Sequence, residues 1–268
     1  MGNNKKTDAC AELKTRIPEL PYIMSMHGWG IAARLMDRWL HLGANSVPEQ
    51  GVHDTTTVQM NWVLSFPIAA EVYDKAHAEK VWVNEAAQRR IEKDLIRGRG
   101  LLPKEIGERL EIGNVGEGEF LHPGNWLQFH KNWQVQLREV KQSIIKSPID
   151  ELYGALGDFS FYYLVKGWVE HIADKGGSPR YKVTINRVGV YIRDSYDFNG
   201  PQTLGFWGCN PIYIGNGLKL QGSSNRYHVT NGDFRTWREK YGRGYGGDFL
   251  VFSNIKRFNT NDSFEFSK

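Results

Sequence analysis

The sequence has little cysteine and no long apolar run, and both absences narrow the class of protein. Only two cysteines occur in 268 residues, Cys10 and Cys209, and they lie far apart in the chain. A disulfide framework is therefore not expected, which favours a reducing compartment. The longest apolar run, at 159–165, contains Ser160 and is too short to span a bilayer. The first residues carry charge with no apolar segment behind them, so we expect no Sec signal peptide.

The recognised catalytic motifs are also missing. The chain contains no H-E-x-x-H, no Cys/His zinc pattern, no Walker loop and no G-x-S-x-G elbow. Residues 242–247 match G-x-G-x-x-G in form, but a predicted helix precedes them and a predicted strand follows, the reverse of a dinucleotide site. The net charge of +4 is small for this length, so no nucleic-acid partner is expected.

What is present is ordinary globular material, with 40% hydrophobic and 24% charged residues. Residues 1–16 are polar and predict a flexible tail. The rest, 17–268, predicts a single α+β domain that is helix-rich over 17–148 and β-rich over 150–256. Since each half alone would expose wide apolar stripes, we expect the helical half to pack on an antiparallel C-terminal sheet.

Apolar spacing predicts the elements of the first half. Helical periodicity predicts helices over 23–42, 68–96 and 125–146. Strict alternation over 57–66, closed by Pro67, predicts a strand.

The second half has strand periodicity. Two alternating segments begin at Phe159 and Tyr181 and flank the turn at 175–179, so they predict a long antiparallel hairpin. A change of phase near Asn186 predicts a bulge. Further strands are predicted at 204–207, 227–230 and 249–255, and a helical turn at 234–240. The alternation also predicts a set of buried core residues: Phe161, Tyr163, Val165, Val183, Ile185, Val190 and Val251.

Polar side chains are densest where the second hairpin strand ends. Arg193, Asp194, Tyr196 and Asp197 follow one another there, on scaffolding that could hold a site rigidly. Two carboxylates beside a phenol could share acid and base roles on an ester or phosphodiester, or bind a divalent cation. Alternatively, 197–200 is simply a turn in which Asp197 bonds local backbone and Arg193 pairs with Asp194.

Two later residues complete the candidate set. Asp233 precedes the predicted turn 234–240, where it would cap that helix or contribute a further carboxylate. His228 is the nearest histidine downstream of the cluster that folding could bring close. The sequence specifies no cofactor and no metal.

Seven segments of this chain resemble an uncharacterised proteobacterial domain family that is commonly encoded beside type VI secretion genes and sometimes joined to spike-tip domains. Besides Trp29, the matching segments are MDRW (36–39), VQMNWVL (58–64), ALGDF (155–159), RVGVYIRDSYDF (187–198), LGFW (204–207), VTNGDFR (229–235) and GGDFLVFS (246–253). The resemblance implies a role in contact-dependent competition between bacteria, without implying an activity.

A second resemblance covers fewer residues but implies a specific reaction. DSYDF at 194–198 is similar to the D-x-Y-D-F element of colicin M type bacteriocins, which cleave the lipid-linked peptidoglycan precursor at its pyrophosphate link. In that family a His-Arg pair follows within a few residues, whereas 199–210 contains neither; Arg226 and His228 are the nearest later candidates.

Together these observations lead to two hypotheses of different class. The first is a secreted antibacterial effector, a hydrolase acting on a cell-envelope substrate. It would be made in the bacterial cytoplasm without a signal peptide, delivered to a target cell, and countered by a cognate immunity protein. The second is a non-enzymatic cargo, adaptor or interaction module that binds the secretion spike.

Overall fold

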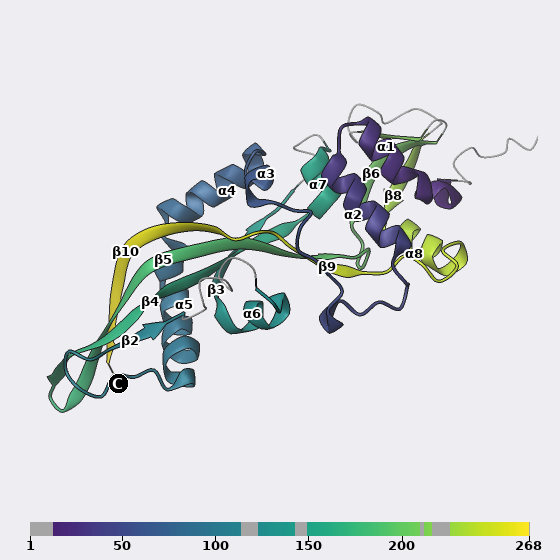
Figure 1. The fold of residues 1–268 in the computed structure, drawn as a ribbon. Coiled ribbons are helices and arrows are strands. Elements are labelled where there is room, and N and C mark those ends of the chain that lie inside the picture. Colours follow the sequence, from purple (N-terminus) through teal and green to yellow (C-terminus); the bar gives the residue numbers. More distant parts are fainter. Residues whose placement is uncertain (1–12, 114–122, 143–148, 210–211, 216–225, 268) are drawn as a thin grey trace, which may run out of the picture. The chain divides into compact units, whose positions relative to one another are not determined.

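In the computed structural model the chain divides into two compact units, each assembled from separated segments (Figure 1). The first unit comprises 1–57, 141–158 and 194–251, and the second comprises 58–140, 159–193 and 252–268. The structure describes residues 13–113, 123–142, 149–209, 212–215 and 226–267. Most of the predicted tail, together with Cys10, lies outside these residues.

The protein is α+β, as predicted, with helices and strands interspersed along the chain. Both units therefore draw elements from both halves of the sequence. The prediction of one domain over 17–268 stays a prediction. Along the described part of the chain, no helix combines the length and apolar character needed to cross a bilayer.

The second unit is built on the long hairpin of β4 (Phe159–Lys175) and β5 (Ser178–Tyr196), of which residues 194–196 belong to the first unit. Figure 1 shows β4, β5 and β10 (Lys256–Ser267) as curved ribbons side by side. β10 pairs with β5, and β2 (Arg109–Ile112) and β3 (Gln134–Val140) pair with β4, all antiparallel.

The predicted turn and bulge are confirmed. The hairpin closes at Lys175 and Ser178, and the register shifts where Lys166 and Gly167 face Arg187 and Ile185. At Gly167 the two strands approach so closely that a Cβ would lie 1.9 Å from the carbonyl oxygen of Thr184. Only glycine fits there.

Helices pack on both faces of this sheet because successive strand residues point to opposite sides. On one face Tyr73 of α4 (Pro67–Ala78) contacts Phe161, and Trp82 of the 3-10 turn η3 (Val81–Val83) contacts Tyr163. On the other face Trp126 of α6 (Trp126–Trp133) contacts Tyr191.

The predicted core is confirmed, since all seven residues are buried. Val183 lies on the central strand, opposite Val169 of β4 and Phe264 of β10, and is 0% exposed.

We expect Val183→Ala to lower the free energy of unfolding by about 1–3 kcal/mol, because its buried methyl groups leave a cavity. Urea denaturation followed by fluorescence measures the change. Ser263→Ala, on exposed sheet surface, is the matched control and should change stability little. Equal effects of the two substitutions would contradict the core assignment.

Helices dominate the first unit. Its helices are η1 (Leu13–Glu19), α1 (Leu20–Met26), α2 (Gly30–His41), η2 (Pro48–Gln50), α7 (Glu151–Leu156) and α8 (Asn231–Lys240). Its sheet is β7-β6-β8, from Ile212–Gly215, Thr203–Cys209 and Arg226–Thr230, and β1 (His53–Asp54) pairs in parallel with β9 (Phe249–Phe252). At its centre Trp39 contacts Phe198, Phe234 and Trp237 with ring centroids 4.7, 5.8 and 5.7 Å apart.

In two segments the type of secondary structure differs from the one predicted. Residues 57–66 contain α3 (Met60–Val63), a helical turn that buries Met60 and Val63 and whose first N–H bonds the Asn254 side chain at 2.7 Å. The helix predicted over 125–146 ends at Trp133 and continues as β3. The apolar spacing there suits both forms, and pairing with β4 outweighs the helical pattern.

Other predicted segments are interrupted or extended. The 68–96 helix breaks at Lys80, whose φ of 46° is left-handed, and resumes as α5 (Glu85–Arg90), a π-helix (Ile91–Ile96) and η5 (Arg97–Arg99). The 23–42 helix is split at Gly28, which has φ 78°. Residues 13–16, predicted as tail, are in η1. β10 had no predicted counterpart.

Candidate functional site

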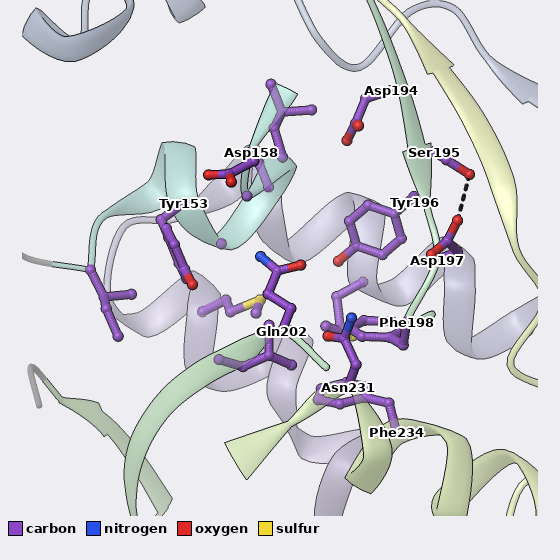
Figure 2. Close-up of a pocket in the computed structure, with 18 of the residues that line it drawn as sticks. Tyr153, Asp158, Asp194, Ser195, Tyr196, Asp197, Phe198, Gln202, Asn231 and Phe234 are labelled. Atoms are coloured by element: carbon purple, nitrogen blue, oxygen red, sulfur yellow. Dashed lines mark hydrogen bonds between the residues drawn. The ribbon is translucent and has the colours of Figure 1, made fainter. Parts of the chain in front are cut away.

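A pocket of about 140 Å³ lies within the first unit, around the end of β5 (Figure 2). Asp194, Tyr196 and Asp197 line it from that strand end and the turn that follows. The loop after α7 contributes Asp158, and α8 contributes Asn231. The volume suits a benzene-sized group or one end of a larger molecule.

The turn after β5 is held by its own side chains. The Asp197 carboxylate accepts hydrogen bonds from the Ser195 hydroxyl at 2.7 Å and from the Asn199 N–H at 2.9 Å. The Arg235 guanidinium donates to the carbonyls of Phe198 and Gly200. Asp197 therefore does what the turn alternative predicted, while also lining the pocket.

Tyr196 is a buried wall of the pocket. Its ring stacks on Phe249 with centroids 5.1 Å apart and meets Phe198 edge-on at 5.8 Å. Burial, with the nearby charge of Asp194, raises the pKa of the Tyr196 hydroxyl well above its ordinary value. The group therefore stays neutral and can both donate and accept a hydrogen bond.

Asp158 is a pocket residue that our sequence analysis did not select. It is exposed and accepts a hydrogen bond from the Gln142 N–H at 2.6 Å. Gly157 before it has φ 55°, and a Cβ there would meet the Gln202 side-chain nitrogen at 2.7 Å. A glycine-aspartate pair between a short helix and a strand was the available signal.

Tyr153 and Gln202 are two further polar residues that line the pocket. Figure 2 shows Tyr153, Gln202 and Tyr196 around one space, with Asp158 and Asp194 beside it. The Tyr153 hydroxyl donates to the Thr203 carbonyl at 2.7 Å, which ties α7 to β6. Burial raises the Tyr153 pKa, and a hydrogen bond with Gln202 offsets part of the effect.

Asn231, also not selected from sequence, has an unsatisfied acceptor. The residue is 2% exposed, and its side-chain N–H donates to the Asn199 carbonyl at 2.7 Å. Its Oδ1 is buried without a hydrogen-bond partner among the residues that the structure describes. Leaving such an oxygen unpaired costs about 1–3 kcal/mol, so a donor from a ligand or water would stabilise it.

The remaining predicted site residues lie away from the pocket lining. Arg193 belongs to the second unit, where burial and then the Arg193 charge lower the His130 pKa to about 4. His228 is exposed on β8, with its ring nitrogen 3.0 Å from the Thr203 hydroxyl. The cluster and its later partners are therefore not all brought together.

Asp233 has the capping role that its position predicted. It is the third residue of α8 and accepts from the Thr230 N–H at 2.8 Å, completing a capping box. Tyr227 donates to it at 2.9 Å, and Lys14 forms an ion pair at 3.2 Å. Burial acts to raise the Asp233 pKa, but the bonds from Thr230, Tyr227 and Lys14 outweigh it and lower the pKa.

We expect Asp233→Asn to lower the free energy of unfolding by about 1 kcal/mol at neutral pH, because the charged cap is lost. The pKa of Asp233 in the folded protein is below its ordinary value of 3.8. The charged cap therefore stabilises the protein fully above pH 3.8, and this stabilisation is lost as the pH falls through the folded-state pKa. Denaturant titrations between neutral and acid pH should therefore show the two proteins converging in acid. A difference that is independent of pH would contradict this role.

The charged side chains among the described lining residues are all acidic. Its described lining includes the carboxylates of Asp158, Asp194 and Asp197 and no lysine, arginine or histidine. Among the described residues, no group of three or more His, Cys, Asp or Glu side chains is placed to hold a metal ion. A cation bound here would therefore depend on carboxylates together with groups brought by a ligand.

Comparison with known proteins defines the family. A model of a family of unknown function, DUF6402, matches residues 15–267, so the chain belongs to that family. No curated protein matches the chain. No solved structure matches it either.

Proposed function

We propose that this protein is an antibacterial effector associated with type VI secretion, and that its pocket hydrolyses a cell-envelope substrate. One observation carries the enzymatic part of the proposal. Asp194, Tyr196 and Asp197, selected from sequence as an acid-base set, line a single pocket together with Asp158. The resemblance of seven chain segments to domains encoded beside secretion genes supports the delivery route.

The chemistry assigns different roles to the carboxylates. Asp194 acts as general base and takes a proton from water, whose oxygen then bonds to the electrophilic centre as the bond to the leaving oxygen breaks. That oxygen takes a proton from solvent. Asp197 shares its lone pairs with the turn, and so holds the strand end in position.

In its more specific form, the proposal names a lipid-linked peptidoglycan precursor as the substrate, because residues 194–198 are similar to an element of colicin M type bacteriocins. Its pyrophosphate is anionic, and no basic side chain is among the described residues that line the pocket. A divalent cation carried by the phosphates and held by one or two carboxylates would compensate that charge. Chelation of divalent cations is then expected to abolish hydrolysis.

The alternative is a non-enzymatic cargo, adaptor or interaction module of the secretion spike. Tyr22 and Met26 on α1 support it, since they are 70% and 71% exposed and large apolar side chains at a surface favour contact with a partner. In either form, the protein would be made in the cytoplasm and act in or on a target cell. As an effector, it would be paired with an immunity protein.

Expression directed to the periplasm of a susceptible bacterium separates the two functions. The effector proposal expects loss of viability there and none on cytoplasmic expression, because the substrate is in the envelope. The adaptor alternative expects no toxicity and stable co-purification with a spike protein. Growth with full accumulation of folded protein in the periplasm would contradict the effector proposal.

A further inference from the structure

One edge of the sheet in the second unit is a single long strand. β10 contains twelve residues and pairs with β5 alone among the strands that the structure describes. In Figure 1 it is the outermost of the three curved ribbons. Its outer side therefore carries a row of backbone N–H and C=O groups that no strand of the described chain bonds. The other side of the hairpin differs, because there β4 pairs with β2 and β3, of four and seven residues.

β10 remains regular along this edge. Half-buried and exposed side chains alternate at all twelve positions, although the register against β5 shifts between Asn259 and Asp262. On the half-buried side, the Phe258 ring contacts His77 and Trp82 with centroids 4.5 and 4.9 Å apart. The strand contains no proline, which would remove a backbone donor. The edge is therefore able to accept a further strand.

The order of side chains along β10 is complementary to the same order reversed. When two copies of the strand are placed antiparallel about a two-fold axis at Asn261, complementary residues face one another. An ion pair, an aromatic pair and a polar pair result: Arg257 with Glu265, Phe258 with Phe264, and Asn259 with Ser263. Each pair occurs twice because of the symmetry, and no two like charges are opposite. Facing pairs of these kinds stabilise antiparallel strands.

This complementarity belongs to one register. With the axis one residue to either side, Arg257 would face Ser263 or Ser267, and the ion pair would be lost. In the register centred on Asn261, both charged groups are accessible. Arg257 is exposed, and the side chain of Glu265 is 46% exposed. Glu265 already pairs with Arg180 of its own chain, but a carboxylate can accept from a second guanidinium as well.

We propose that β10 is a dimer interface, at which two copies of this chain pair antiparallel about Asn261 and join their sheets into one. A strand of another protein would bond the same backbone groups, but the self-complementary order of β10 would then have no role. The inference does not depend on the proposed function.

Sedimentation of the full-length protein over a range of concentrations tests the proposal. A reversible dimer of the 30.7 kDa chain is expected. Arg257→Glu and Glu265→Arg each place like charges opposite one another at both ends of the interface. Each should weaken the dimer by at least about tenfold. Arg89→Glu, on the exposed surface of α5, is the matched charge reversal and should leave the dimer unchanged.

A mixture of the two weakened variants tests which residues face each other. In a mixed dimer of Arg257→Glu with Glu265→Arg, every facing charged pair is again one arginine and one glutamate. An equimolar mixture should therefore dimerise about as tightly as the unsubstituted protein, although neither variant does so alone. The chain that carries both substitutions should also recover the dimer.

Cross-linking tests the register without altering a charge. In a chain with Cys10→Ser and Cys209→Ser, Asn261→Cys places two thiols opposite each other at the two-fold axis. Facing Cβ atoms in antiparallel strands are about 4.5–5.5 Å apart, close to the spacing that a disulfide needs. Oxidation with copper phenanthroline should therefore link the two copies. Ser263→Cys in the same background is the control and should link far less, because position 263 faces Asn259 of the other copy.

Each contrary outcome overturns the proposal. A monomer at every concentration would leave the edge to a strand of another protein. A dimer that neither charge reversal weakens would place the interface elsewhere, and a mixture that stays monomeric would reject the facing pairs. Equal cross-linking at positions 261 and 263 would reject the register. Melting curves identify the folded variants, and the cross-link decides the matter where a charge reversal prevents folding.

Discussion

Asp194→Asn is expected to abolish periplasmic toxicity while leaving the melting temperature nearly unchanged. Asparagine keeps the shape of the side chain but cannot take a proton from water, and loss of a general base costs about 100-fold or more in rate. Plating efficiency after periplasmic expression measures toxicity. Thermal unfolding of the purified protein measures stability.

Two further variants make this result specific. Glu239→Gln has the same change of charge on an exposed helical surface and should remain fully toxic. Asp197→Asn should instead lower stability by about 1 kcal/mol, because it weakens the acceptor that holds Ser195 and Asn199. Full toxicity of Asp194→Asn would remove this carboxylate from the mechanism.

Residues 150–268 expressed alone are expected not to fold cooperatively. β4 would lose β2 and β3, which pair along one of its edges. Phe161 and Tyr163 would lose the aromatic cover of α4 and η3. In the first unit the aromatic cluster would lose Trp39, which is 0% exposed. The fragment would therefore expose unpaired strand edges and a large apolar surface.

Solubility, sedimentation and a urea transition of the fragment measure this effect. Co-expression of residues 1–149 is the matched control, because it restores every missing strand and helix without a covalent link. We expect soluble protein only when both fragments are present. A soluble, monomeric and cooperatively folded 150–268 fragment would contradict both this expectation and the predicted single domain.

The sequence pattern predicted secondary structure correctly where the structure of a segment depends mainly on residues close together in the sequence. The alternation over 159–192, the turn at 175–179 and the shift near Asn186 predicted β4, β5 and their bulge. The capping role of Asp233 could be predicted from the sequence for the same reason, because a capping box spans only a few residues. Periodicity failed at 57–66 and 134–140, where apolar spacing suits more than one element and distant partners decide.

The sequence by itself determined the fold class, the central hairpin with its buried core, and the polar cluster at the end of β5. Only the tertiary structure decided what surrounds that cluster. It brought Asp158 and Asn231 to Asp194, although these residues lie on three separate stretches of chain, and it left Arg193 in the second unit. The physical reason is that a pocket is made by packing between segments distant in sequence, whereas periodicity records only how each segment meets its own neighbours.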